Sequence, residues 1–387
     1  MAKLGDICTV VSGSTPKTGV AEYWDGTVKW ITPAELNEDS FYITDSVRHI
    51  TEDGKEKTGL SYLPKGTVIL SSRAPIGKTA IAGCEMCCNQ GFKNLICSDA
   101  VYNEYLYFFL KSKTNYLNSL GRGATFKEIS KSIVEKIEIP LPNIEKQHQI
   151  VKELKATRNL IAHRKQQLTK LDELIKARFV EMFGDPISNP FGFKVKTLQK
   201  MIDDGTIMYH LDGNHGSDYP RNEEFVECGV PYISANCIVH NDVNLKLAKH
   251  LTEERASKLR KGIAQNGDVL FAHNATVGPV AILYTDDEKV ILGTSLTAYR
   301  CDKERMVPDY LKAYMQSEGF VCQYTKDMKQ TTRNQVPITA QRKFLFVIPP
   351  LSLQNQFAAF AAEVDKSKLF AELFAQNACI LAENRSK

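Results

Sequence analysis

The 387-residue sequence lacks the patterns that mark several large classes of protein. No run of 18 apolar residues occurs, so we expect no membrane-spanning helix. The opening stretch MAKLGDICTVVSGSTPK has neither the apolar segment nor the small-residue cleavage site of a secretory signal. The ten cysteines are therefore expected to be reduced, in a cytoplasmic protein.

Patterns for catalysis are missing as well. The sequence has no GxxxxGKS/T phosphate loop, no GxGxxG after a strand-like run, no GxSxG and no HExxH. Cys84 and Cys87 form a CxxC pair that could begin a zinc site. A second pair with matching spacing is absent, so small buried thiols are the favoured interpretation. These absences indicate a protein that is not an enzyme and that holds no metal or cofactor of its own.

The composition is that of a folded protein with more than one domain. Apolar residues make up 43% of the chain and charged residues 24%, so sizeable cores are expected. A chain of this length usually forms two or three units. The net charge of +4 permits contact with nucleic acid without requiring it.

The most informative feature is a phrase that occurs twice. The first half contains IEIPLPNIEKQHQIVKEL, and the second half contains FVIPPLSLQNQFAAFAAEV. Ile348 lies 209 positions after Ile139, and Gln356 lies 209 positions after Gln147. In each copy a strand-like run meets two prolines, and a long helical segment follows.

Four further blocks repeat in the same order. GTVILSSRAPIGKTAIA matches GDVLFAHNATVGPVAIL, which begins 201 positions later. VKWITPAEL matches VPYISANCI, EYLYFFLKS matches DYLKAYMQS, and FKEISKSIVEKIEIP matches QVPITAQRKFLFVIP. We infer a tandem duplication with a unit near 200 residues, which is far longer than a solenoid repeat.

Each copy has the character of a mixed α/β domain followed by a helix. β-branched runs such as TVILSS and DVLFAH lie between Gly and Pro residues, and NEYLYFFLKSKTNYLNSL has helical spacing. The sequence predicts two similar globular recognition domains, separated by long helices that form an antiparallel coiled coil, as a pseudo-twofold tandem repeat. The expected boundaries are a first domain at 1–142, a helix at 143–183, a linker turn at 184–192, a second domain at 193–350 and a second helix at 351–387.

The two helical segments carry a narrow apolar stripe. The stripe consists of Leu154, Ile161, Leu168, Ile175, Met182, Leu353, Phe357, Phe360, Val364, Phe374 and Leu381. A helix of about 40 residues is about 60 Å long, which is more than one small domain covers, so we expect the helices to pair. Two copies related by a pseudo-twofold axis require an antiparallel pair. The alternative is that each helix packs only on its own globular domain.

These motifs, in this order, resemble the specificity subunit of a type I restriction-modification system. The resemblance rests on LGDICTVVSGSTP, WITPAEL, ILSSRAPIGK, NQGFKNL and IPLPNIEKQHQIV, followed by a helix that ends in FVEMFGDPISNP. All but the last recur more loosely in the second half, so the resemblance covers essentially the whole chain. The second copy departs from the first, because it has AHNATVG in place of SRAPIGK.

The resemblance implies that each globular domain is a target recognition domain that reads one half of a bipartite sequence in double-stranded DNA. It implies that the paired helices set the gap between the half-sites and dock two methyltransferase subunits, and that the assembly recruits a restriction subunit. S-adenosylmethionine, ATP and Mg would then be held by those partner subunits, and no membrane partner is implied. The alternative function is a two-headed scaffold that binds protein and not DNA.

The resemblance fixes no DNA-contacting residue, so candidates come from polar and basic side chains in loops. Arg73 and Lys78 flank a Gly-containing loop and suit phosphate or guanine, whereas His273 and Asn274 could read adenine. The full set of candidates is Lys17, Arg73, Lys78, Arg122, Thr125, Lys127, Arg221, His273, Asn274, Lys329, Thr332, Arg333, Asn334 and Gln335. The competing interpretation of each is a solvated or loop-stabilising side chain, whereas Trp30 and Tyr232 are expected in the core.

Overall fold

The computed structural model describes residues 1–73, 75–122, 127–214, 216–328 and 334–385, without the side chains of 217, 326–328 and 371–385. The chain divides into two compact units. Unit 1 consists of Met1–Lys165 with Glu372–Lys387, and unit 2 consists of Gln166–Ala371. The long helices are α6 (Ile144–Phe183) and α12 (Leu351–Arg385), close to the expected bounds, and both unit boundaries fall inside them.

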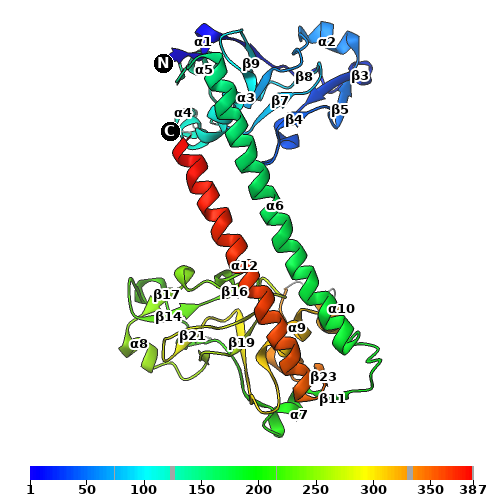
Figure 1. Ribbon diagram of the computed structural model, residues 1–387, viewed down its shortest axis with the longest axis vertical. Helices are drawn as coiled ribbons and strands as arrows, with labels where there is room; N and C mark the ends of the chain where they lie inside the picture. The colour runs from blue at the N-terminus through cyan, green and yellow to red at the C-terminus, as the bar shows by residue number, and fades with distance from the viewer. Residues whose placement is uncertain (74, 123–126, 215, 329–333, 386–387) are drawn as a thin grey trace. The chain divides into compact units, whose positions relative to one another are not determined.

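Unit 1 contains a five-stranded sheet in the order β2-β9-β6-β7-β4, a three-stranded sheet β5-β3-β8 and a two-stranded ribbon β1-β10 (Figure 1). Its strands are β1 (Ala2–Lys3), β2 (Cys8–Ser12), β3 (Trp24–Ile31), β4 (Tyr42–Ile43), β5 (Arg48–Ile50), β6 (Val68–Ser71), β7 (Thr79–Ala82), β8 (Cys87–Cys88), β9 (Phe92–Cys97) and β10 (Glu138–Ile139). Its helices are α1 (Leu4–Ile7), η1 (Ala21–Tyr23), η2 (Pro33–Glu35), α2 (Glu52–Thr58), α3 (Asn103–Ser112), α4 (Thr114–Leu120) and α5 (Lys131–Glu135). The helical spacing of NEYLYFFLKSKTNYLNSL therefore spans two helices, because the backbone at Lys113 leaves the helical conformation.

Unit 2 repeats this arrangement. Its four-stranded sheet β12-β22-β19-β20 corresponds to β2-β9-β6-β7, its five-stranded sheet β13-β17-β14-β21-β18 contains the counterpart of β5-β3-β8, and β11-β23 corresponds to β1-β10. The strands are β11 (Lys194–Thr197), β12 (Ile207–Asp212), β13 (Phe225–Val226), β14 (Val230–Ile233), β15 (Ile238–Val239), β16 (Asp242–Val243), β17 (Lys249–Leu251), β18 (Ile263–Ala264), β19 (Val269–Ala272), β20 (Val280–Ile282), β21 (Val290–Leu292), β22 (Leu296–Cys301) and β23 (Leu345–Ile348). The helices are α7 (Leu198–Asp203), η3 (Gly216–Asp218), η4 (Asn222–Glu224), η5 (Ala235–Cys237), η6 (Leu245–Leu247), α8 (Glu253–Ser257), α9 (Pro308–Gln316), α10 (Glu318–Met328) and α11 (Ile338–Gln341). The predicted duplication is confirmed at the level of sheet order.

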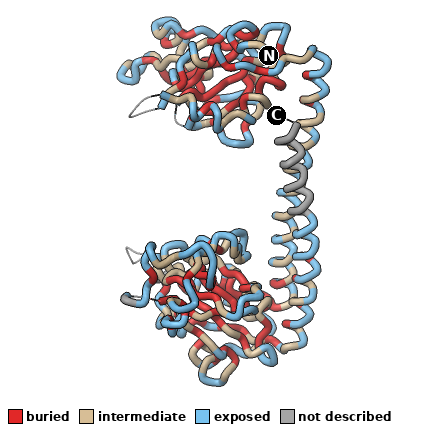
Figure 2. Tube along the Cα trace, turned by 90° about the vertical axis from the view of Figure 1, so that its left-hand side faces the viewer, coloured by how far each residue is buried: buried red, intermediate tan, exposed pale blue. Residues whose placement is uncertain are grey.

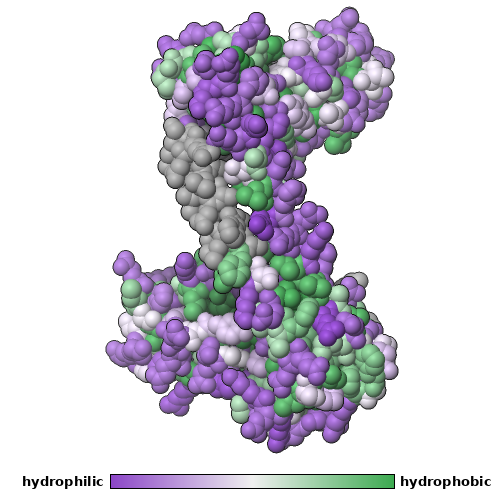
Figure 3. Space-filling model, viewed as in Figure 1, coloured by the Kyte–Doolittle hydropathy of each residue, from purple (hydrophilic) through white to green (hydrophobic). Residues whose placement is uncertain are grey.

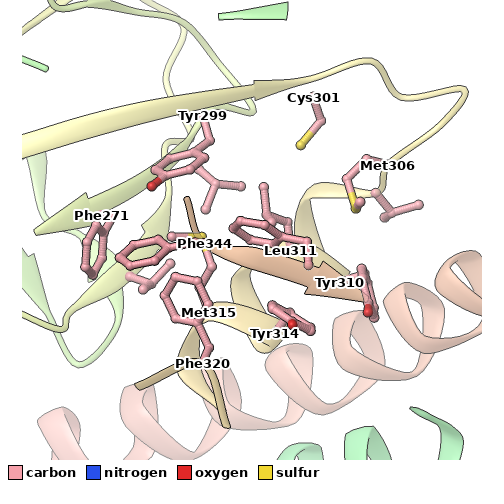
Figure 4. Close-up of a cluster of buried hydrophobic side chains, with 14 of the residues drawn as sticks. Phe271, Tyr299, Cys301, Met306, Tyr310, Leu311, Tyr314, Met315, Phe320 and Phe344 are labelled. Carbon is pink, nitrogen blue, oxygen red and sulfur yellow. The ribbon is translucent and has the colours of Figure 1, made fainter. Parts of the chain in front are cut away.

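Each globular part has its own buried core (Figure 2). In unit 1, apolar strand residues such as Val68 and Leu70 pack against Leu106 and Leu110 of α3. In unit 2, the largest cluster is rich in aromatic side chains, which approach one another from β19, β22, α9 and α10 (Figure 4). The two cores explain why each copy of the duplicated sequence folds as a distinct α/β body.

A buried glutamine fixes the start of α6 to the globular part of unit 1. Gln147 is 0% exposed, and its side-chain oxygen accepts a hydrogen bond from the Tyr102 N–H at 2.8 Å. Its amide donates to the carbonyl oxygens of Ala100 and Pro142 at 3.0 and 2.9 Å. Tyr102 is the residue before α3, so this glutamine joins the first turn of α6 to the start of α3.

The same joint exists in unit 2, but at a different residue from the one expected. Gln354 is also 0% exposed, accepts from the Val307 N–H at 2.9 Å and donates to the Pro349 carbonyl at 2.9 Å. The prediction that Gln356 matches Gln147 is therefore wrong, and Gln356 is exposed. Two residues turn about 200° around a helix, so Gln356 points away from the domain.

The two long helices pair in unit 2. Lys368 of α12 makes an ion pair with Asp172 of α6 at 2.7 Å, and Phe357 packs edge-on against Phe179 with ring centroids 5.6 Å apart. As the residue number increases along α6 from Asp172 to Phe179, the residue number of the partner on α12 decreases from Lys368 to Phe357. The predicted antiparallel pairing is therefore confirmed within unit 2.

The predicted apolar stripe is largely covered where its side chains are described. Phe357 and Val364 are buried, and the partly buried members are Leu154, Ile161, Leu168, Ile175, Met182, Leu353 and Phe360. Phe374 and Leu381 lie outside the described side chains. The alternative interpretation is also partly correct, because Val151 joins the core of unit 1, and Phe357 and Ala361 join that of unit 2.

Hydrophilic side chains cover much of the face of each unit drawn in Figure 3, and apolar side chains gather over part of unit 2. Within the described ranges, none of the helices combines the length and the apolar character that crossing a bilayer requires.

Candidate nucleic-acid interface

In unit 1, four loop segments are held side by side by backbone hydrogen bonds. The Asn89 N–H donates to the Ile31 carbonyl at 3.0 Å, and the Ser72 N–H donates to the Gly91 carbonyl at 2.8 Å. The Ile129 N–H then donates to the Ser72 carbonyl at 2.9 Å. A further bond, from the Ser14 N–H to the Cys88 carbonyl at 3.0 Å, adds the loop that follows β2. We call residues 14–17, 72–73, 89–91, 122 and 127–129 the loop edge of unit 1.

Unit 2 repeats three of these bonds at matching positions. The Gly293 N–H donates to the Ile233 carbonyl at 2.7 Å, and the His273 N–H donates to the Ser295 carbonyl at 2.9 Å. The Val336 N–H donates to the His273 carbonyl at 2.8 Å. Residues 233–236, 273–276, 293–295 and 334–336 form the loop edge of unit 2. The duplicated fold therefore presents two corresponding sets of loops.

An ion cluster organises the loop edge of unit 1. The Glu128 carboxylate accepts from Arg73 at 3.0 Å and from the buried Lys93 at 3.2 Å. Burial alone would raise the pKa of Glu128, but the hydrogen bonds from Lys93 and Arg73 outweigh burial and lower it. Backbone hydrogen bonds between Arg122 and Glu128 close the loop that separates them. The cluster holds the Arg73 and Arg122 loops together while Arg73 stays exposed.

Neutral amides take the place of this ion cluster in unit 2. Asn274 and Gln335 form the bridge that corresponds to Arg73 and Glu128. Behind them, the buried Gln341 accepts from the Tyr299 hydroxyl at 2.6 Å and donates to Thr297 Oγ1 at 3.0 Å. Among the residues that the structure describes, the loop edge of unit 2 thus presents amide side chains where unit 1 has the ion cluster.

The structure brings several predicted residues of unit 1 to its loop edge. Lys17, Arg73, Arg122 and Lys127 all lie there with exposed side chains. Lys78 does not, because its ammonium donates to the carbonyl oxygens of residues 33 and 36 at 3.2 and 2.6 Å. Its contacts stabilise the domain internally, so the prediction of a phosphate contact at this residue does not fit the geometry.

In unit 2, Asn274, Asn334 and Gln335 lie at the loop edge and remain candidates. His273 is 0% exposed, so its imidazole is not available to a base in this structure. Arg221 is exposed at the start of η4, where its N–H donates to Glu224 at 2.6 Å. The predicted residues that lie outside the described part of the chain are Thr125, Lys329, Thr332 and Arg333.

Sequence reasoning missed a basic residue beside each loop edge. Arg48 on β5 and Lys249 on β17 are exposed, and each lies over an aromatic ring. The available signal was a repeated order of two aromatic residues and then a cation. Trp30 and Tyr232 are buried, as predicted.

No metal centre is seen among the residues that the structure describes, since they contain no group of three or more His, Cys, Asp or Glu side chains placed to hold an ion. Cys87 and Cys88 are consecutive residues of β8, and burial raises the pKa of the Cys88 thiol to about 12. The sulfur of Cys84 instead contacts the Thr44 carbonyl at 3.2 Å.

The architecture of two α/β units with loop edges and long helices is that of solved specificity subunits. One chain from a study of complex assembly and conformational transition in a type I restriction-modification system aligns over 100% of this chain and 95% of its own length, with TM-score 0.61 and 17% identity. A crystal structure of a type I S subunit from M. genitalium aligns over 100% and 94%, with TM-score 0.55 and 14% identity. These similarities establish the fold class.

Sequence comparison finds a similarity to the same class of protein. Residues 1–173 match the family described as type I restriction modification DNA specificity domain. The MjaIX specificity subunit of Methanocaldococcus jannaschii is 37% identical over 247 residues, which is 61% of this chain and 57% of that protein. The MjaVIII specificity subunit of the same organism is 24% identical over 279 residues, or 70% and 65% of the two chains. The chain is thus similar to type I specificity subunits, as its motifs indicated, and it spans less than two thirds of the length of these relatives.

Proposed function

We propose that the protein is the sequence-specific DNA-binding subunit of a type I restriction-modification complex. Each unit binds one half of a bipartite target in double-stranded DNA through its loop edge. The observation that carries this proposal is the duplicated loop edge, in which the same backbone bonds hold loops of different chemistry. A common frame that carries different side chains in the two units suits the reading of two unlike half-sites.

The long helices have a second role in this proposal. Their antiparallel pairing sets the gap between the half-sites, and their exposed faces dock two methyltransferase subunits. A restriction subunit joins that assembly. S-adenosylmethionine, ATP and Mg are held by these partners, so the chain itself is not an enzyme, and the complex acts on DNA in the cytoplasm.

The test is selection of bound fragments from random duplex DNA, with the full chain co-expressed with the methyltransferase subunit of its own system. Two short sequences at one fixed spacing are the expected result. A test variant carries Gln335→Ala, which alters an amide at the loop edge of unit 2, and the half-site read by unit 1 serves as its internal control. The variant is expected to relax one half-site and leave the other intact, because each side chain belongs to one unit. A folded complex that enriches no sequence would refute the proposal and favour a scaffold that binds protein.

A further inference from the structure

Each unit carries an exposed cation that lies over at least one ring of an aromatic pair, and nothing in the proposed function yet uses it. In unit 1 the Arg48 guanidinium carbon lies 3.8 Å from the centroid of the Trp24 ring and 5.6 Å from that of Trp30. The two indoles meet edge-on with centroids 5.2 Å apart. Both rings are buried, so they form a firm surface beneath the cation.

This aromatic pair is attached to the loop edge. The Trp24 Nε1–H donates to the Lys17 carbonyl at 3.2 Å, and the Trp30 Nε1–H donates to the Ser14 carbonyl at 3.0 Å. Indole nitrogens can only donate, so each bond fixes the ring and the loop together. Arg48 is thereby positioned next to the loop that carries Lys17.

Unit 2 has the same arrangement with different residues. The Lys249 ammonium lies 4.5 Å from the centroid of Phe225, whose ring meets Tyr232 at 5.2 Å. The strand register is also the same, because Arg48 is paired with Trp30 across β5 and β3, and Lys249 with Tyr232 across β17 and β14. The order aromatic, aromatic, cation is therefore kept while all three residue types differ.

The Arg48 guanidinium is free to bind a ligand. Within the described part of the chain no carboxylate pairs with it, whereas the neighbouring Asp45 pairs with Lys29 and His49. A guanidinium stacked on a ring keeps its N–H edge open for two oxygen acceptors. Among the described residues, the Lys249 ammonium donates a hydrogen bond to Asn222 Oδ1 at 3.3 Å, and its other two N–H groups remain able to donate.

Stability alone is a weak reason for these cations. An exposed cation on an aromatic ring contributes only about 0.5–1 kcal/mol. The loop edges differ in chemistry between the units, as expected for readers of different sequences. An exposed cation that occurs in both units is instead suited to bind a group that both half-sites contain. The phosphates of the DNA backbone are such a group, because they are present in every duplex.

We propose that Arg48 and Lys249 are equivalent phosphate contacts, one in each unit, which fix the register of each loop edge on the DNA backbone. This inference rests on the proposed function and adds to it the residues that bind DNA without reading sequence. Arginine meets the phosphate through two N–H groups, and lysine meets it as a point charge. Neither residue selects a base.

The experiment measures the affinity of the full chain, complexed with its methyltransferase subunit, for target and unrelated duplexes across a salt series. Arg48→Met and Lys249→Met are the test variants, because the methionine stem still covers the aromatic ring. Lys3→Met is the matched control, since Lys3 is an exposed cation on the β1-β10 ribbon. Tryptophan fluorescence during denaturation verifies the folding of Arg48→Met.

Each test variant is expected to bind both duplexes more weakly and to have a shallower salt dependence, by about 0.9 in the slope of log K against log salt. Between 50 and 200 mM salt it therefore loses about 3.5-fold less affinity than the wild type. Arg48→Lys restores the slope, and Lys3→Met leaves it unchanged. Wild-type slopes in both test variants, with the wild type still binding DNA, would overturn this inference alone. A base preference that changes without a change of slope would overturn it too, whereas a wild type that binds no DNA refutes the proposed function.

Discussion

The buried glutamines at the starts of α6 and α12 lead to a sharp prediction about stability. Replacing Gln147 by alanine removes three hydrogen bonds and leaves the Tyr102 N–H and two carbonyl oxygens without this partner. An unsatisfied buried polar group costs about 1–3 kcal/mol, and the lost side chain leaves a small cavity. We expect Gln147→Ala to lower the free energy of unfolding of unit 1 by about 2–4 kcal/mol.

The two tryptophans make this measurable in one unit at a time. The chain has only two, Trp24 and Trp30, and both belong to unit 1. Tryptophan fluorescence in urea therefore reports unit 1, while circular dichroism reports both units. With a denaturant slope of about 2 kcal/mol per molar urea, the fluorescence midpoint of Gln147→Ala falls by about 1–2 M.

Exposed glutamines on the same helices provide the controls. Gln149 and Gln356 are exposed, so their replacement by alanine is expected to change stability by at most about 0.5 kcal/mol. Gln354→Ala is expected to shift the circular dichroism transition and to leave the fluorescence midpoint in place. If Gln149→Ala lowers the fluorescence midpoint as much as Gln147→Ala, the three hydrogen bonds of Gln147 add no stability to unit 1, and the reasoning is refuted.

Three other perturbations follow from the packing and the charges. Burial lowers the pKa of His210 from its ordinary value of 6.5 to about 4. As the pH falls from 6.5 to 4, His210 therefore binds a proton in the unfolded state but stays neutral in the folded state. Unit 2 is therefore expected to lose up to about 3 kcal/mol between pH 6.5 and pH 4, and His210→Gln is expected to flatten that loss in urea titrations. Glu128→Gln deprives the buried Lys93 of its carboxylate and is expected to cost unit 1 about 1–2 kcal/mol by fluorescence, with Glu138→Gln, which changes an exposed carboxylate, as the neutral comparison. Phe357→Ala opens a cavity where α12 meets α6 and is expected to destabilise unit 2 by about 3–5 kcal/mol in calorimetry, against little effect for the exposed Gln356→Ala.

The repeat and the long helices could be predicted because they depend on patterns that the sequence displays directly. Apolar spacing and proline positions gave α6 and α12 within a few residues. The match of Gln356 to Gln147 failed because the Ile-Pro pairs set an offset of 209, whereas the equivalent carbonyls of Ile137 and Phe344 lie 207 positions apart, as do Gln147 and Gln354. An error of two residues selects another face of the helix.

The candidate interface was harder to predict because burial depends on tertiary context. His273 and Asn274 are adjacent at the loop edge, yet His273 is buried and Asn274 is partly exposed. Lys78 looked available, but two carbonyl oxygens that are distant in sequence hold its ammonium. The contact of Arg48 with Trp30 and Trp24 could not be predicted, because these rings lie 18 and 24 positions earlier in the chain.

The hydrogen bonds described above for Gln147 and Gln354 all join main-chain atoms of the domains that these residues hold. A peptide N–H or carbonyl is the same whatever side chain the residue bears. The side chains around each joint can therefore change without altering the groups that the glutamine binds. Each glutamine joint can therefore hold a domain with a different set of loops, while the sequence of the long helix stays the same.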